Sequence, residues 1–316
     1  MRHRRFDYRR IPGAAYILVA QVIIFGLIDG RWLSPANLLN VAYQMAPLLA
    51  VSVGATVVIL TEGIDLSPGG IIGLAGVAAA MVLQSDMGIG LSILSGLATG
   101  AAIGALNGLV ITVGGIPPFV ATLGTLGITQ GVGLVLTQGA SVAGLSSDFQ
   151  YIGQGIIGLP VNFWIALAVM ALFMVILKRT SFGTYVYAMG GNREATAYAG
   201  INVKGNLTLV YTIGGLLSGV AAILMAAHDN AAHPRFAVGI EFDAIAAVIL
   251  GGTTFDKGRG GLWGTLVGVA TIAFLRNGLN FSGMHATWQI PVIGIVIIGA
   301  IAVNEMMQRS LAREVV

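Results

Sequence analysis

The sequence predicts an all-α membrane protein with about ten transmembrane helices. Two observations predict this class. First, 56% of the 316 residues are hydrophobic and only 9% are charged, whereas a soluble domain is about 25% charged. Second, the mean hydropathy is +0.88, and apolar stretches of about 20 residues, the length of a membrane-spanning helix, recur along the chain. No stretch has the composition of a linker, so residues 1–316 are expected to form a single transmembrane domain.

A hydropathy window of about 19 residues locates the expected spans in order. Their centres fall near residues 22, 49, 77, 100, 127, 169, 217, 247, 272 and 295. The first span follows a basic N-terminus, as a signal peptide would. It ends in Ile28-Asp29-Gly30 without a small-residue cleavage site, so we interpret it as an uncleaved helix.

The basic residues predict the orientation of these spans. Counting ten spans from a cytoplasmic N-terminus places the basic residues on the cytoplasmic side, apart from Arg31 and Arg235 outside and Arg276 within a span. An odd number of spans would destroy this bias, so both termini are expected in the cytoplasm. Two segments then lie between spans on opposite sides: the polar, Gly-rich residues 137–159 in the periplasm and the basic residues 178–206 in the cytoplasm.

The stretch "TEGIDLSPGG" at residues 61–70 predicts a discontinuous helix. Ser67 can accept hydrogen bonds from free N–H groups, and Pro68 fits the first helical position. A helix from Pro68 to about Leu83 is too short to cross the bilayer, so irregular backbone before it must be buried in protein or line a water-filled cavity. The span at 242–252 is short as well. Asp65 has three interpretations, which are binding the free N–H groups of the break, contacting substrate, and relaying protons.

Small residues recur at intervals of four, which places them on one helix face and predicts close helix packing. They are Gly96, Gly100, Gly104 and Gly108 in one span and Gly260, Gly264 and Gly268 in another. Each of these spans ends in Asn-Gly-Leu, at Asn107 and at Asn277. Because the two spans would run in opposite directions, the repetition is what an inverted repeat would produce.

The cytoplasmic loop contains a second motif, Glu194-Ala195 followed by Gly200-Ile201. It predicts a short helix with a surface of small alanine side chains that ends at Gly200. Lying between two spans, such a helix can pass motion from a soluble partner to the membrane bundle. The alternative is an ordinary amphipathic connector.

These motifs resemble the permease subunits of ABC importers, in particular the ribose/xylose/galactose type. The Glu-Ala…Gly pattern is similar to their coupling loop. The stretch "GIDLSPGG" at 63–70 is similar to a family signature that has Val in place of Pro68. Residues 248–280 are similar to a later family block that ends in "LRNGL". By this resemblance the ATPase-coupling residues are Gly191, Asn192, Glu194, Ala195, Ala199, Gly200 and Ile201. The residues at the broken helix and the substrate pathway are Asp65, Ser67, Asn107 and Asn277.

The resemblance implies a permease subunit of an ATP-driven, binding-protein-dependent importer of a monosaccharide or small polyol in the bacterial inner membrane. Its partners would be cytoplasmic ATPase subunits, an extracytoplasmic sugar-binding protein, a second permease chain (identical or related) and membrane lipid, with no nucleic acid. No Gly-x-x-x-x-Gly-Lys-Ser/Thr motif occurs, so ATP hydrolysis is expected on a separate chain. We expect no enzymatic activity, cofactor or metal in this chain.

Two other functions have some support in the sequence. Glu62, Asp65, Asp243 and His228-Asp229 would suit an ion-coupled secondary transporter, since ionisable groups within a membrane are functional candidates. A membrane-embedded enzyme has less support, because the four His residues show no metal-ligand spacing. We interpret "HDNAAHPRF" at 228–236 as an outer loop that contacts the binding protein.

Overall fold

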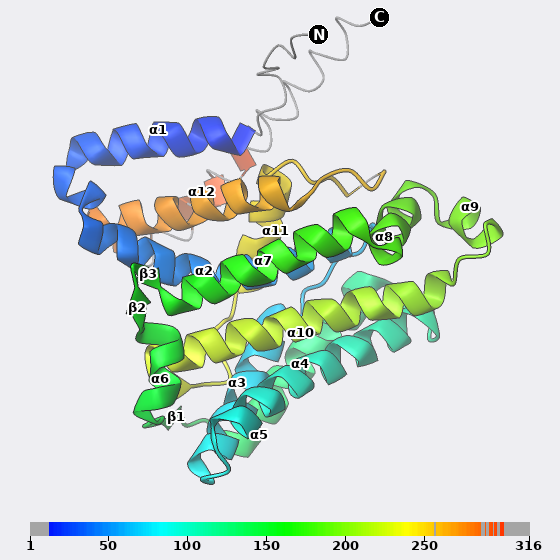
Figure 1. Ribbon diagram of the computed structural model, residues 1–316, viewed down its shortest axis with the longest axis horizontal. Coiled ribbons are helices and arrows are strands. Elements are labelled where there is room, and N and C mark those ends of the chain that lie inside the picture. Colours follow the sequence, from blue (N-terminus) through cyan, green and yellow to red (C-terminus); the bar gives the residue numbers. More distant parts are fainter. Residues whose placement is uncertain are drawn as a thin grey trace, which may run out of the picture.

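The computed structural model describes residues 13–255 and 257–285, together with residues 288, 291, 292, 294, 295, 298 and 299. The described residues contain twelve α-helices, most of which pack side by side in a bundle (Figure 1). Six of these helices are long and apolar enough to cross a membrane. They are α2 (Pro35–Ile59), α4 (Ile89–Thr112), α5 (Pro118–Thr137), α7 (Val161–Arg179), α10 (Val203–Asp229) and α12 (Leu262–Phe281).

Three shorter helices complete the bundle, namely α1 (Gly13–Ile28), α3 (Pro68–Gln84) and α11 (Ile240–Leu250). These nine helices coincide with the first nine predicted spans. Most residues around the tenth, centred near 295, lie outside the described part of the chain. The all-helical membrane class is therefore confirmed, whereas the predicted number of about ten spans is not.

The remaining elements lie at the two ends of the bundle (Figure 1). One end carries α6 (Ser147–Gln154) and the two-residue strands β1 (Val142–Ala143), β2 (Ile156–Ile157), β3 (Leu159–Pro160) and β4 (Ala231–Ala232). Antiparallel pairing joins β1 to β4 and β2 to β3. The opposite end carries α8 (Ser181–Gly191) and α9 (Arg193–Tyr198), and a 3-10 helix, η2 (Gly30–Leu33), joins α1 to α2. Residues 137–159 and residues 178–206, the two segments predicted to lie on opposite sides of the membrane, are thus at opposite ends of the bundle.

The helices α4 and α10 pack closely along their glycine residues. A Cβ atom at Gly100 would overlap the backbone of Gly215, and one at Gly104 would overlap the Tyr211 carbonyl. On α12, Gly268 approaches the Ala247 carbonyl of α11 in the same way. The predicted packing role is confirmed for the α4 glycines and for Gly264 and Gly268, because a side chain at these positions would force the helices apart. Gly260 was predicted on the same helix face as Gly264 but lies in the loop before α12, where a Cβ would meet Thr253.

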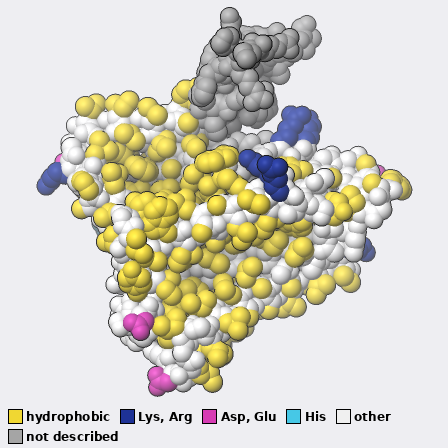
Figure 2. All heavy atoms as spheres, in the orientation of Figure 1, with side chains coloured by type: hydrophobic (Ala, Val, Ile, Leu, Met, Phe, Trp, Pro, Cys, Tyr) yellow, Lys and Arg dark blue, Asp and Glu magenta, His cyan; other side chains and the backbone are white. Residues whose placement is uncertain are grey.

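The outer surface is apolar, as a surface in contact with lipid must be. Figure 2 shows hydrophobic side chains spread over the visible face of the helices and few charged ones. The exposed large side chains include Leu94 on α4, Ile128 on α5 and Leu172 on α7. A contiguous apolar surface of this kind is rare on soluble proteins.

Candidate functional site

The predicted discontinuous helix is present, and its first part is irregular backbone. The chain leaves α2 through a turn with Glu62 at a φ of 61° and then runs without regular structure over residues 63–67 to Pro68. Asp65, Leu66 and Ser67 are buried. The 17 residues of α3 span only about 25 Å at 1.5 Å per residue, less than the roughly 30 Å of the hydrocarbon core.

Asp65 fixes the start of α3. Its Oδ1 atom accepts hydrogen bonds from the Ser67 backbone N–H at 2.8 Å and from the Ser67 hydroxyl at 2.5 Å. The prediction that Ser67 caps the helix with its side chain is wrong, because its hydroxyl makes no capping bond. The Asp65 carboxylate takes the acceptor role instead, and the Ser67 hydroxyl donates to it.

The same network reaches the two following helices. The Asn107 side chain of α4 donates to Ser67 Oγ at 2.9 Å, and Thr125 of α5 donates to Asn107 Oδ1 at 2.6 Å. The Leu66 N–H donates to Thr122 Oγ1 at 3.1 Å. Three of the four predicted pathway residues, Asp65, Ser67 and Asn107, are therefore in one hydrogen-bonded chain.

Asn277, the fourth predicted pathway residue, lies apart from this network. Its amide exchanges two hydrogen bonds with the Asn37 amide, at 2.9 and 3.0 Å, and so joins α12 to α2. Asn37 also donates to the Trp32 carbonyl at 2.7 Å. The shared Asn-Gly-Leu sequence therefore does not give Asn107 and Asn277 the same partners.

The two short helices begin beside each other. Gly69 in the first turn of α3 faces the Ala237 carbonyl and the Glu241 carboxylate at the start of α11, and Gly73 faces the Pro234 carbonyl. Glu241 is 1% exposed, and its Oε1 accepts from the Gly239 N–H at 3.2 Å. A carboxylate near two helix N-termini is favoured by both helix dipoles. Glu241 immediately precedes the short span predicted at 242–252, but its contact with α3 was not predicted.

The predicted coupling segment forms the short helix α9, which projects from the end of the bundle (Figure 1). Asn192 caps it by accepting from the Ala195 N–H at 2.8 Å. Ala195, Ala197 and Ala199 are exposed, as expected. Gly200 has a φ of 83° and follows the helix end, where a left-handed conformation favours glycine. The remaining coupling residues, Gly191 and Glu194, are exposed, and Ile201 is half-buried.

The end of the bundle that carries α9 is connected directly to the irregular segment. The Arg193 guanidinium donates to the Thr61 carbonyl, and Gly190 packs against the Leu60 carbonyl. Tyr187 of α8 donates to the Gly260 carbonyl at 3.4 Å, and burial raises the pKa of its hydroxyl. Arg193 was expected only as a basic loop residue, because nothing in its local sequence indicates the distant carbonyl.

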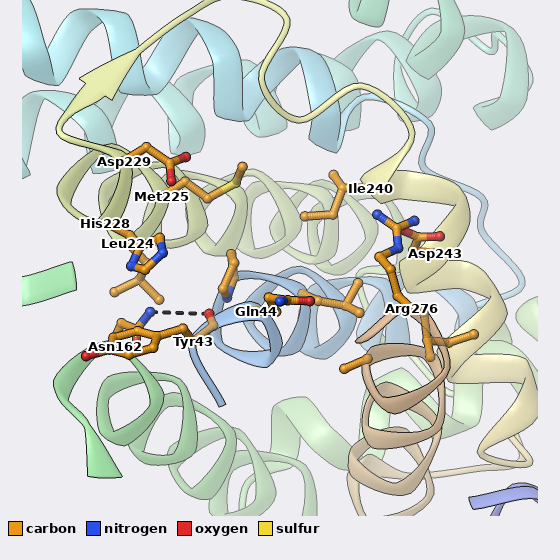
Figure 3. Close-up of a pocket in the computed structure, with 14 residues that line it drawn as sticks. Tyr43, Gln44, Asn162, Leu224, Met225, His228, Asp229, Ile240, Asp243 and Arg276 are labelled. Atoms are coloured by element: carbon orange, nitrogen blue, oxygen red, sulfur yellow. Dashed lines mark hydrogen bonds and ion pairs between the residues drawn. The ribbon is translucent and has the colours of Figure 1, made fainter. Parts of the chain in front are cut away.

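A cavity of about 250 Å³ lies between α2, α7, α10, α11 and α12. Figure 3 shows Gln44 pointing into it between the Tyr43–His228 pair and the Asp243–Arg276 ion pair. In this ion pair the Arg276 Nη2 and Asp243 Oδ2 atoms are 2.5 Å apart. None of the residues predicted for ATPase coupling or the broken helix lines the cavity, because its wall comes from helices that are distant in sequence. His228, Asp229 and Asp243, which the sequence offered as candidates for an ion-coupled transporter, do line it.

The segment predicted as an outer loop, 228–236, begins in the last turn of α10 and contacts residues 142–154 as well as its own residues. His228 Nδ1 lies 3.4 Å from the Gly153 carbonyl, and His233 Nδ1 accepts from the Arg235 N–H at 3.1 Å. Within the described part of the chain, no group of three or more His, Cys, Asp or Glu side chains is placed to hold a metal ion.

Comparison with known proteins identifies the family. Residues 37–301 match the family described as "Branched-chain amino acid transport system / permease component". The chain belongs to this permease family. It is 40% identical to the ribose import permease protein RbsC of Bacillus subtilis over 286 residues, which are 90% of this chain and 89% of that protein. The identity to RbsC of Escherichia coli K12 is 37% over 296 residues, 92% of each chain.

Relatives with other named solutes match along the same length. The D-allose transport system permease protein AlsC of Escherichia coli is 33% identical over 300 residues, 94% of this chain and 92% of that protein. The galactose/methyl galactoside import permease protein MglC of Escherichia coli is 33% identical over 320 residues, 95% of each. No solved structure matches the chain.

Membership of this family gives the chain its class. It is a multi-pass inner-membrane permease component of an ABC importer, and hence a transport subunit rather than an enzyme. A permease of this kind works with ATPase subunits and a substrate-binding protein. The predicted resemblance to sugar-importer permeases is confirmed.

Proposed function

We propose that the chain is the membrane-spanning subunit of an ATP-driven importer that receives a monosaccharide or similar small polyol from a binding protein. The observation that carries this proposal is the similarity along nearly the whole chain to permeases named for ribose, allose and galactose. The family description names branched-chain amino acids. We favour a sugar because all three of these full-length relatives are named for one.

The α9 helix and its flanking residues are the proposed contact with the ATPase. The exposed surface of Ala195 and Ala199 offers small side chains that a cleft on a partner can enclose, and Glu194 supplies an exposed charge beside them. Gly191, Asn192, Gly200 and Ile201 determine where the helix begins and ends. This end of the bundle is therefore proposed to face the cytoplasm, as are both termini, while α6 and its strands face the periplasm.

The irregular segment before α3 is the proposed element through which the ATPase acts on the substrate pathway. Asp65, Ser67 and Asn107 hold it by hydrogen bonds, and Arg193 of α9 donates to the carbonyl of Thr61 in the turn just before it. Asn277 is proposed to fix α12 against α2 rather than to contact substrate. The functional unit is proposed to contain a second permease chain, identical or related, with lipid around the apolar surface.

The test is transport by the reconstituted complex. Proteoliposomes that contain the permease, its ATPase and the binding protein should accumulate ribose, allose or galactose only when ATP is present. Glu194→Ala and Gly200→Val should lower uptake about tenfold, within the 1–3 kcal/mol typical of coupling between sites. Both variants should still insert into the membrane. Lys204→Ala, at an exposed position at the start of α10, is the matched control and should transport normally.

Two results would contradict this proposal. Uptake driven by a proton or sodium gradient without the ATPase would support an ion-coupled transporter instead. Normal ATP-driven uptake by both the Glu194 and the Gly200 variants would remove the coupling role from α9 while leaving the importer assignment in place.

A further inference from the structure

The cavity between α2, α7, α10, α11 and α12 carries several polar and ionisable side chains in a largely apolar wall. Gln44, Asp229 and Arg276 are exposed to it, and the Arg276 side chain is 46% accessible. Polar and ionisable groups at membrane depth face the protein interior or a water-filled space, because exposure to lipid is costly. The polar side chains of the wall are therefore suited to contact with water or with a polar ligand.

The chemistry of the wall disfavours an anionic ligand and suits one that bears hydroxyl groups. Its one positive charge, on Arg276, is already paired with Asp243 at 2.5 Å, so an anionic ligand would have to compete with a carboxylate. The Gln44 amide can both donate and accept hydrogen bonds. Leu224, Met225 and Ile272 add apolar surface to the same cavity. A monosaccharide presents the matching combination of hydroxyl edges and C–H faces.

The location of the cavity fits a solute that enters from the α6 end of the bundle. The rings of Tyr43 and His228 form one wall, with centroids 4.9 Å apart. The Tyr43 hydroxyl donates to the Gln154 carbonyl at 2.8 Å, and the Gln154 side chain donates to the His228 carbonyl at 2.8 Å. The C-terminal end of α6 is thus bonded to two cavity residues, and α6 belongs to the segment proposed to face the periplasm.

The size of the cavity limits what it can hold. Its volume of about 250 Å³ lies just below the roughly 300–1,000 Å³ of pockets that bind drug-sized ligands. We propose that this cavity is a transient binding subsite for a single monosaccharide within the permease chain, with Gln44 and the Asp243–Arg276 pair as its polar contacts. The proposal rests on the proposed function and extends it by naming residues that meet the solute.

The absence of cysteine from the chain allows a direct test. A single cysteine is introduced as Gln44→Cys or, in case that variant does not fold, Met225→Cys, and the complete transporter is treated with a small polar methanethiosulfonate reagent. We expect labelling at either position to lower uptake at least fivefold. Millimolar ribose, allose or galactose, whichever is transported, should slow the labelling severalfold. Val113→Cys, exposed at the far end of α4, should react at the same rate with and without sugar.

The outcomes separate the subsite from the importer function. If the unmodified complex shows ATP-driven uptake but sugar does not slow labelling at either cavity position, the subsite is wrong and the importer assignment stands. Oxidative cross-linking of two permease chains through Cys at position 44 would also overturn the subsite, because the wall would then face a second chain. If the unmodified complex shows no ATP-driven uptake, the proposed function itself fails.

Discussion

At the scale of single residues, the irregular segment before α3 is stabilised by a chain of hydrogen bonds in which each side chain donates to the next. Thr125 donates to Asn107, Asn107 donates to Ser67, and Ser67 donates to Asp65. Each hydroxyl or amide group along the chain therefore has its donor and acceptor roles assigned. Because a buried polar group without a partner costs about 1–3 kcal/mol, each member depends on the others.

This direction predicts the effect of Asn107→Asp. The substitution removes the N–H donor to Ser67 and places a second carboxylate near Asp65, at a position that is 1% exposed. We expect the free energy of unfolding in detergent to fall by about 1–3 kcal/mol, the cost of unsatisfied buried polar groups, and uptake to fall with it. Thermal unfolding of the purified chain measures the first effect.

A matched control uses the same substitution where only an acceptor is needed. Asn202 is exposed and accepts from the Gly205 N–H at 2.9 Å as the cap of α10, a role that Asp fills equally well. Asn202→Asp should therefore leave the unfolding temperature unchanged. Equal stability of the Asn107→Asp and Asn202→Asp variants would show that the hydrogen-bond chain does not hold the segment.

At the scale of helices, the glycine face of α4 decides how closely α10 approaches. Gly104→Val would drive a side chain into the Tyr211 carbonyl and the Gly215 backbone. Overpacking of this kind costs about 1–3 kcal/mol, so we expect a lower unfolding temperature and less folded protein in the membrane. Gly90→Val on the same helix is the control, since a Cβ there meets no atom within 4 Å. Similar losses in both variants would attribute the effect to helix propensity alone.

Features that depend on local sequence could be predicted at this scale. The Ser67-Pro68 break and the glycine series were predicted because one helix turn or one helix face is enough to specify them. The bonds between Asn277 and Asn37, 240 positions apart, could not be, since the identical Asn-Gly-Leu sequences gave no information on partners. The cavity around Gln44 was missed for the same physical reason, because five helices distant in sequence form its wall.

At the scale of the whole molecule, the contacts follow the predicted inverted repeat. If α2, α3 and α4 correspond to α10, α11 and α12, then the packing of α4 against α10 corresponds to that of α12 against α2. Both packings are present, and the corresponding helices α2 and α10 also touch, as do α3 and α11. The repeat stays a prediction; if it holds, it also accounts for the two short helices beginning beside each other.

The molecule also contains a continuous connection from α9 to the start of α3. Arg193 donates to the Thr61 carbonyl, and the segment that follows Thr61 ends in the Asp65–Ser67 hydrogen bonds. A partner that shifts α9 would therefore pull on the irregular backbone and not only on a surface loop. We predict that Arg193→Gln lowers sugar uptake severalfold while ATP hydrolysis by the complex continues, because the bond to Thr61 is weakened or lost.

The measurement is the number of sugar molecules transported per ATP hydrolysed, compared with that of Arg179→Gln. Arg179 is an exposed basic residue at the end of α7, so the control removes the same charge without touching Thr61 and should keep the normal ratio. Loss of ATP hydrolysis in the Arg193 variant would instead indicate that Arg193 serves docking of the ATPase. An unchanged ratio would mean that motion reaches the membrane helices by another route, such as the contact of Gly190 with the Leu60 carbonyl.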